Sequence, residues 1–282
     1  MKISFYTIAK DEIYWIEPCL LSIKDVADEI VFVDNGSTDG TPEKVEALMK
    51  KHKLPIRMFS FPKETDLSEV RNFAISKCSN EWLFAWDADF VAFEQASKHS
   101  IQRMLNLFEH KRFYDRYAAI NMPCPIMRYF MGKAPKAEQM HPANCYMINK
   151  KFVSIKMHAN RGWDDRVFRG GRKPIVHRDY CFISVDVKSD ERCMLRRFRS
   201  KWRLYRAKHK LDISLRDYIK NVVKQDINDA SFIYKVPAVN FSYEIPKILT
   251  RYLMKPPYKT IMKGGKVVGR RFDFDRLRKL EL

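Results

Sequence analysis

Strand-like and helix-like spacings of apolar side chains alternate along the first 90 residues. Residues 2–8 alternate apolar and polar side chains, residues 14–23 repeat apolar side chains at helical spacing, and residues 29–33 form a largely β-branched run. The next predicted elements are helices at 41–52 and 66–78 and strands at 56–60 and 82–86. Such alternation predicts the α/β fold class, with a mostly parallel central sheet flanked by helices.

The rest of the chain has a less regular pattern. We expect a helix near 94–108 and strands at 118–122, 145–148 and 181–187. Beyond Lys188, apolar side chains recur at three- and four-residue steps between many Lys and Arg residues, as Leu195, Phe198, Trp202 and Tyr205. This spacing predicts a basic amphipathic helix, whose apolar stripe either packs on the domain or anchors to a membrane. We therefore divide the chain into an α/β catalytic domain (1–187) and a basic, largely helical C-terminal extension (188–282).

Positive charge is concentrated in the last third of the chain. The formal net charge is +19, and the segment from Lys188 onward has 25 Lys and Arg against 10 Asp and Glu. Clustered cations suit an anionic partner, such as an acidic polymer or an anionic membrane surface, although a basic solvated surface is the alternative. We do not expect nucleic acid as the partner.

Hydropathy and cysteine usage indicate a cytoplasmic protein, with peripheral membrane contact as an alternative. No apolar run approaches the roughly 18 to 20 residues that span a bilayer, and the N-terminus lacks the pattern of a secretory signal. The six cysteines are scattered without zinc-site spacing, which favours free buried thiols.

Carboxylates follow two of the predicted strands. Asp87 and Asp89 come directly after the strand at 82–86, and Asp34 ends the strand at 29–33. Because ligands bind beyond the carboxyl ends of strands in open α/β sheets, we expect these acids to share one edge. A short acidic pair can hold a divalent cation and leave positions for phosphate oxygens, although in isolation such a pair is more often a solvated turn.

The turn after Asp34 does not have the glycine spacing of a phosphate cradle. It runs through residues 35–40 to Thr41 and Pro42, a pair typical of a helix start with Thr41 as the N-cap. Neither the P-loop nor the dinucleotide pattern is present. Neutralisation of a phosphate must therefore come from elsewhere, as a metal ion would provide.

Together these features resemble the nucleotide-binding half of the inverting family 2 glycosyltransferases, which have the GT-A fold. The features follow one another between residues 3 and 90: a strand with Thr7, a Lys10-Asp11-Glu12 turn, the segment Val-Asp-Asn-Gly-Ser-Thr-Asp-Gly-Thr, the pair Arg71-Asn72 on a helix, and Asp-Ala-Asp after a Trp-Leu-Phe-Ala-Trp strand. The resemblance covers about a third of the chain.

The resemblance implies roles for five polar residues of this half. Thr7, Asp34 and Arg71 would line the base pocket, Asp87 would face the ribose, and Asp89 would bind Mn²⁺ or Mg²⁺ on the diphosphate. For Arg71, an ion pair on the helix surface is the alternative. The donor would be a nucleotide-diphosphate sugar, with UDP favoured and GDP and dTDP open, and the acceptor a glycan, a lipid-linked group or another hydroxyl.

In the implied reaction, an acceptor hydroxyl attacks the anomeric carbon with inversion while a carboxylate removes its proton. Asp164 and Asp165, after Gly162 and Trp163, are the candidates for this base on a loop facing the acceptor. The family often has Glu-Asp here, so either aspartate can be the base; Asp179 is a second choice, and a helix cap is the alternative role for the pair.

A histidine late in the chain can complete the metal coordination in this resemblance. His177 is the candidate, since neutral imidazole is a suitable ligand, and a purely structural histidine is the alternative. His141 is a weaker candidate.

Two other functions are compatible with the sequence. A noncatalytic polyanion-binding protein would use the basic extension and keep the α/β half as a scaffold. A sugar nucleotidyltransferase would also bind nucleotide and metal on such a sheet, but it should have a glycine-rich basic loop where this chain has Lys10, Asp11 and Glu12.

Overall fold

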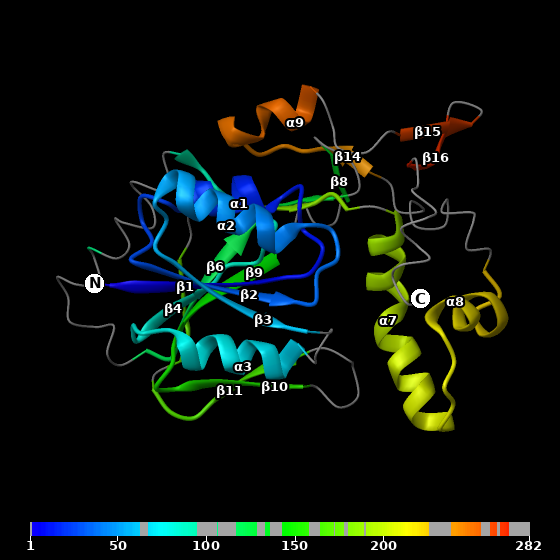
Figure 1. Cartoon of the computed structure of the whole chain (residues 1–282), viewed down its shortest axis with the longest axis horizontal. Helices are drawn as coiled ribbons and strands as arrows, with labels where there is room; N and C mark the ends of the chain where they lie inside the picture. Colours follow the sequence, from blue (N-terminus) through cyan, green and yellow to red (C-terminus); the bar gives the residue numbers. More distant parts are fainter. Residues whose placement is uncertain are drawn as a thin grey trace.

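A seven-stranded sheet in the order β12-β6-β9-β4-β1-β2-β3 forms the centre of the computed structural model (Figure 1). The structure describes residues 2–62, 67–94, 106, 117–128, 133–135, 143–157, 164–171, 173–177, 180–188, 190–225, 238–254, 260–263 and 266–270. The strands of the sheet are β1 (Ile3–Ala9), β2 (Glu29–Asn35), β3 (Ile56–Phe61), β4 (Trp82–Ala85), β6 (Ala119–Cys124), β9 (Ala143–Asn149) and β12 (Ile175–Val176).

Most pairings in this sheet are parallel, as predicted. β1 pairs in parallel with both β2 and β4, β2 with β3, and β12 with β6, whereas β9 runs antiparallel to its two neighbours. The strands and helices expected in the first 90 residues are therefore confirmed. The antiparallel insertion of β9 between β4 and β6 is not visible in the sequence pattern.

Helices cover both faces of the parallel half because successive side chains of β1 point to opposite faces. Phe5 belongs to the core under α1 (Ile16–Ser22) and α2 (Thr41–His52), and Tyr6 belongs to the core under α3 (Leu67–Lys77). Figure 1 shows α1 and α2 on one side of the strands and α3 on the other.

The start of α2 differs from the expectation. The N-cap is Gly40, with a positive φ of 90°, and Thr41 is the first helical residue. The Thr41 hydroxyl accepts a hydrogen bond from the Glu12 backbone N–H at 2.9 Å instead of capping the helix. Glycine tolerates this left-handed conformation without the steric cost that other residues have.

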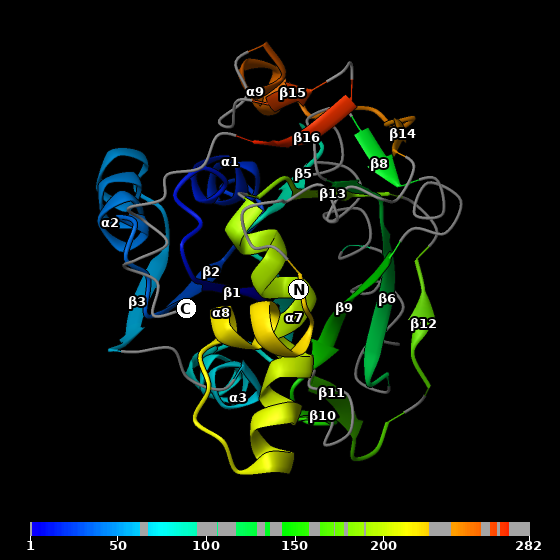
Figure 2. The same cartoon turned by 90° about the vertical axis from the view of Figure 1, so that its right-hand side faces the viewer.

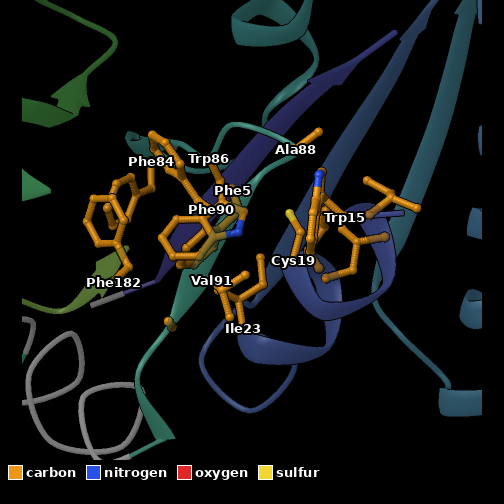
Figure 3. Packing of buried hydrophobic residues seen from close by; sticks show 14 of the residues in the cluster. Phe5, Trp15, Cys19, Ile23, Phe84, Trp86, Ala88, Phe90, Val91 and Phe182 are labelled. Carbon is orange, nitrogen blue, oxygen red and sulfur yellow. The ribbon is translucent and has the colours of Figure 1, made fainter. Parts of the chain in front are cut away.

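A smaller sheet extends the core beyond β4. Its order is β5 (Phe90–Ala92), β13 (Phe182–Asp186) and β7 (Ile126–Arg128). Aromatic rings join the two sheets: Phe84, Trp86, Phe90 and Phe182 are all buried, with ring centroids 5.0 to 5.6 Å apart (Figure 3). The smaller sheet thereby holds the end of β4 against the core.

The remaining elements are short, except for the 20-residue helix α7 (Asp190–His209). The short ones are the hairpin of β10 (Val153–Met157) and β11 (Asp164–Phe168), the pair β8 (Lys133–Pro135) and β14 (Ala238–Asn240), the hairpin of β15 (Thr260–Lys263) and β16 (Lys266–Arg270), α8 (Leu215–Asp217), a π-helical turn (Tyr218–Val222), a 3₁₀ turn (Lys247–Leu249) and α9 (Thr250–Met254). Of the helix expected at 94–108, Glu94 and Asn106 are helical and the rest lies outside the described residues.

The long helix α7 contains the predicted stripe. Phe198 is buried, the Trp202 indole donates to the Ile213 carbonyl at 2.8 Å, and Tyr205 lies against Tyr218. The described part of the stripe therefore packs within the protein. Figures 1 and 2 place α7 beyond the carboxyl ends of β1 and β2.

Part of the predicted extension also packs on the α/β core. Leu249 is fully buried in the core cluster, Tyr252 lies against Trp15, and Arg251 pairs with Glu17 of α1 at 3.0 Å. The division of the chain at residue 187 stays a prediction. Within the described part of the chain, none of the helices has the length and apolarity needed to cross a bilayer.

The aromatic junction should contribute strongly to stability. We expect Phe182→Ala to lower the free energy of unfolding by about 3–5 kcal/mol because it leaves a cavity among buried rings, and Phe182→Leu to cost less than about 1.5 kcal/mol. Urea denaturation measures both. Phe168→Ala is the control, since Phe168 is 45% exposed; equal losses at the two positions would contradict the role of the junction.

The buried carboxylate of Glu29, at the start of β2, should make the free energy of unfolding depend on pH. Glu29 accepts hydrogen bonds from the Ser4 hydroxyl, from the Ser79 backbone and hydroxyl at 2.8 and 2.9 Å, and from Arg57. Burial alone raises the pKa of Glu29, but the hydrogen bonds from Ser4, Ser79 and Arg57 outweigh it and lower the pKa below the ordinary value of 4.5.

A lowered folded-state pKa stabilises the protein above pH 4.5, and the stabilisation is lost as the pH falls through the folded-state pKa. We expect Glu29→Gln to cost about 1–3 kcal/mol at pH 7, and the cost to shrink toward pH 3. Urea denaturation across this pH range tests it, with exposed Glu46→Gln as the control. A cost that does not change with pH would show that the ionised carboxylate is not what stabilises the fold.

Candidate active site

The loops that follow β1 and β2 are joined by hydrogen bonds at the carboxyl edge of the sheet. The Asp11 backbone N–H donates to the Ser37 hydroxyl at 2.9 Å, and the Thr38 backbone N–H donates to the Asp11 carboxylate at 2.7 Å. With the bond from Glu12 to Thr41, these contacts fix the two loops as one platform.

Asp34 forms the turn within this platform. Its carboxylate accepts the backbone N–H groups of Gly36 at 3.1 Å and Ser37 at 3.0 Å, and the residue is 4% exposed. A carboxylate has about four acceptor positions, so these bonds leave capacity for a further donor. The predicted base-pocket residue is thus also the residue that shapes the loop.

Thr7 lies near the end of β1, next to Phe32 of β2. It is fully buried, and within the described residues its hydroxyl oxygen has no hydrogen-bond partner. A buried hydroxyl without a partner is uncommon in folded proteins, and a bound ligand is one way to satisfy it.

Arg71 and Asp87 lie close together. Arg71 lies on α3, and its Nη2 atom is 3.9 Å from Oδ1 of Asp87, which follows β4. The Asp87 side chain is 54% exposed, whereas that of Arg71 is 19% exposed. An ion pair with one open carboxylate can receive a polar ligand on its exposed side.

The turn that contains Asp87 and Asp89 is fixed on two sides. The Phe90 N–H donates to the Asp87 carbonyl at 2.9 Å, and the Val185 N–H of β13 donates to the Asp89 carbonyl at 2.8 Å. Asp89 itself is 8% exposed. The smaller sheet therefore determines where the Asp89 carboxylate lies.

Lys188 joins Asp89 to the platform. Its Nζ atom is 2.5 Å from Oε1 of Glu12 and 3.0 Å from Oδ2 of Asp89, and all three side chains are less than one-fifth exposed. The Trp15 indole donates to the Val187 carbonyl at 2.7 Å and so fixes the backbone next to Lys188. Figure 3 shows Trp15 packed near Cys19 and Ala88.

The sequence pattern predicts no role in the site for Glu12 or Lys188. Glu12 belongs to the Lys10-Asp11-Glu12 turn, and Lys188 is the first residue of the basic extension. The position of Lys188 in the sequence could have indicated a role. Lys188 directly follows an apolar strand, as Asp34 and Asp87 do, and in α/β sheets ligands bind near strand ends.

The side chains of Asp87 and Asp89 suit a divalent cation that has phosphate ligands. Within the described residues, no three His, Cys, Asp or Glu side chains come together as a metal cluster. Mg²⁺ is commonly held by one or two carboxylates plus substrate phosphates, so a complete protein cage is not required. The exposed Asp87 and the buried Asp89 fit that partial set of oxygen ligands.

His177 is not brought next to this acid pair. It follows β12, where its backbone N–H donates to the Asn121 carbonyl at 2.8 Å. β12 is separated from β4 by β6 and β9, which corresponds to roughly 14 Å between strands. Metal ligation by His177 stays a prediction.

The candidate bases lie in a strand and not in the expected loop. Asp164 and Asp165 begin β11 and pair with Met157 and Lys156 of β10, so a helix-start cap is also wrong. The structure describes the backbone of these two aspartates but not their side chains. Asp179 and His141 lie outside the described residues. The assignment of the base stays a prediction.

Two of the buried cysteines, Cys19 and Cys78, are unsuited to nucleophilic chemistry. Cys19, Cys78, Cys124, Cys145 and Cys181 are free thiols. Burial raises the pKa of Cys19 well above its usual value, with the Asp89 charge adding to the effect, and burial raises the pKa of Cys78 to about 12. Such thiols stay protonated at neutral pH and are therefore unreactive.

The acid pair and the cross-linked loop platform lie at the carboxyl edge of the sheet, where ligands bind in open α/β folds. The chain belongs to glycosyl transferase family 2, whose model matches residues 4–161, more than half of the chain. The family expected from the sequence is thereby confirmed.

Several relatives are similar over part of the chain. An uncharacterized glycosyltransferase of Rickettsia bellii is 30% identical over 168 residues, which is 59% of this chain and 52% of that protein. The lipopolysaccharide core biosynthesis glycosyltransferase LpsC of Rhizobium meliloti is 35% identical over 89 residues, 32% of each chain. The chain spans about half the length of the curated Rickettsia relatives it matches.

Two solved structures are also similar. S. aureus TarS in complex with UDP-GlcNAc has a TM-score of 0.46 at 14% identity, over 67% of this chain and 60% of that one. The mannosyltransferase PcManGT from Pyrobaculum calidifontis, in complex with GDP-Man and Mn²⁺, has a TM-score of 0.47 at 17% identity, over 69% and 60% of the two chains.

The Lys188 ammonium should be needed to keep two carboxylates buried together. We expect Lys188→Met to lower the free energy of unfolding by about 3 kcal/mol, because Glu12 and Asp89 lose their shared counter-ion. Adding Glu12→Gln to this variant should recover at least about 1 kcal/mol. Urea denaturation of the single and double variants measures both effects.

Lys151→Met is the control for this prediction. Lys151 pairs with Glu81 at 2.5 Å, but its side chain is 62% exposed, so the cost should stay below about 1 kcal/mol. Equal costs at Lys151 and Lys188, or no recovery in the double variant, would argue against a coupled buried triad.

Proposed function

We propose that the chain is a metal-dependent glycosyltransferase that moves a sugar from a nucleotide-diphosphate sugar to an acceptor hydroxyl with inversion. The observation that carries the proposal is the position of Asp87 and Asp89, which follow β4 at the same edge as the platform formed by the loops after β1 and β2. Membership of glycosyl transferase family 2 supports it.

In this proposal the nucleoside binds over the platform. Asp34 accepts an N–H group of the base, and the buried Thr7 hydroxyl gains a polar partner. Arg71 donates to a base carbonyl or to phosphate, and the exposed Asp87 carboxylate accepts hydrogen bonds from the ribose hydroxyls. UDP is the favoured nucleotide.

Asp89, with Asp87 beside it, is the proposed site of Mn²⁺ or Mg²⁺. The bound metal would supply Lewis-acid neutralisation of the charge that develops on the departing nucleoside diphosphate. The protein would hold Asp89 in place through the hydrogen bond that the Val185 backbone N–H donates to the Asp89 backbone carbonyl. Ligation by His177 stays a proposal and would require the segment after β12 to approach Asp89.

Proton removal from the acceptor hydroxyl is assigned to Asp164 or Asp165. A carboxylate that takes this proton while the hydroxyl attacks the anomeric carbon gives in-line displacement and inversion. The backbone of β11 places the two aspartates on a hairpin with β10, where they pair with Met157 and Lys156.

We further propose that α7 contacts an anionic acceptor or an anionic membrane surface. The helix contains eight Lys and Arg residues against two acidic residues, and it lies beyond the carboxyl ends of β1 and β2 (Figure 2). Clustered cations attract an anionic partner over a distance of about one Debye length, roughly 8 Å at physiological salt.

Nucleotide binding should depend on the metal. We expect one of UDP, GDP, dTDP and CMP, with UDP favoured, to raise the melting temperature clearly in the presence of Mn²⁺ and little in its absence. A thermal-shift screen of each nucleotide with and without Mn²⁺ measures this. At a nucleotide concentration about 100 times Kd, the stabilisation is about 2.7 kcal/mol.

Asp89→Asn is the matched variant for this screen. It should keep the fold, lose the metal-dependent shift, and lose turnover in a sugar-transfer assay, because it removes one charge and one ligand oxygen. Full turnover in Asp89→Asn would contradict the metal assignment. If no nucleotide shifts the melting temperature and polyanion binding weakens steeply with salt, the chain is a polyanion-binding scaffold instead.

A further inference from the structure

One cation already lies at the proposed metal site. The Lys188 ammonium contacts Glu12 at 2.5 Å and Asp89 at 3.0 Å, and its side chain is 17% exposed. Each carboxylate comes from a different strand end, Glu12 after β1 and Asp89 after β4. The ammonium nitrogen therefore lies at a point that two carboxylate oxygens reach together.

The backbone around Lys188 restricts where this ammonium can go. The preceding strand, β13, pairs with β5 and β7, and the Val187 carbonyl accepts the Trp15 indole N–H at 2.7 Å. Trp15 is 1% exposed. Lys188 is thus presented to Asp89 from the end of a packed strand.

A divalent cation and this ammonium need the same carboxylate. Two cations a few ångströms apart repel each other, and the repulsion is stronger at a buried site than in water. An ammonium is also a weaker partner for a diphosphate than a divalent ion, but it is always present. Metal binding at Asp89 must therefore displace the ammonium or overcome its charge.

We infer that Lys188 is a positioning residue that competes with the divalent metal for Asp89, so that the metal binds well only together with the donor diphosphate. This inference rests on the proposed function, in which Asp89 binds the metal. The diphosphate carries enough negative charge to hold both cations, whereas Asp89 and Glu12 alone balance only one of them. Donor binding and metal binding are then coupled, and by linkage each strengthens the other by the same factor.

Measurement of Mn²⁺ affinity without nucleotide tests the inference. We expect Lys188→Gln to bind Mn²⁺ about tenfold more tightly than the wild-type chain, because Glu12 and Asp89 become available to one metal ion. The factor by which UDP strengthens Mn²⁺ binding should fall by a similar amount. Isothermal titration calorimetry and the electron paramagnetic resonance signal of Mn²⁺ in solution both report the affinity without any turnover.

Three further variants control the measurement. Lys188→Arg keeps the charge and should keep the weak Mn²⁺ affinity. Lys151→Gln removes a lysine from an exposed pair and should change nothing. If Lys188→Gln does not fold, Glu12→Gln is compared with Glu12→Gln/Lys188→Gln, and the double variant should bind Mn²⁺ more tightly than the single one.

The outcomes separate this inference from the proposed function. Unchanged or weaker Mn²⁺ binding on loss of the Lys188 charge overturns the inference, and a merely structural role would give this result. If that Mn²⁺ binding is still abolished by Asp89→Asn, the proposed metal site stands. If Mn²⁺ binds equally well to the wild-type chain and Asp89→Asn, both the inference and the metal assignment fail.

Discussion

Parallel pairing of β1 with both β2 and β4 is the constraint on which the rest of the molecule depends. It brings three strand ends, and the loops that follow them, to one edge of the sheet. Residues that are far apart in the sequence, such as Asp34 and Asp87, are therefore brought to the same edge by strand pairing alone. Packing enforces the arrangement, because β1 and β2 are buried on both faces and cannot slip by one residue without moving every side chain to the wrong face.

Charge at this edge is balanced by residues from opposite halves of the chain. Glu12 and Asp89 are buried acids, and a buried carboxylate is costly unless it has a counter-ion or hydrogen bonds. Lys188 supplies the counter-ion, and the smaller sheet that ends in β13 supplies its position. The second sheet is therefore part of the site and not only an addition to the core.

Much of this could be predicted from the sequence, and the parts that could not have a common physical reason. Local periodicity predicted the strands and helices before residue 90, and strand ends predicted the shared edge for Asp34, Asp87 and Asp89, because both depend on neighbours in sequence. The pairing of Lys188 with Glu12 joins residues 176 positions apart, so no local pattern contains it. The resemblance implies a loop for Asp164 and Asp165, but they begin β11, whose pairing with β10 no local pattern reveals because charged residues stand where apolar ones would indicate a strand.

The bond from Trp15 to Val187 spans 172 residues and has a consequence for how the molecule forms. Closing so large a loop costs chain entropy before the contact is gained, so contacts of this kind slow folding and form after local ones. During synthesis at roughly 5–20 residues per second, the N-terminal strands leave the ribosome well before Lys188 does. Until then Glu12 and Asp89 have no counter-ion from Lys188, and the acidic edge stays hydrated and open. The order of synthesis thus makes the closing of this edge a late event in the formation of the protein's core.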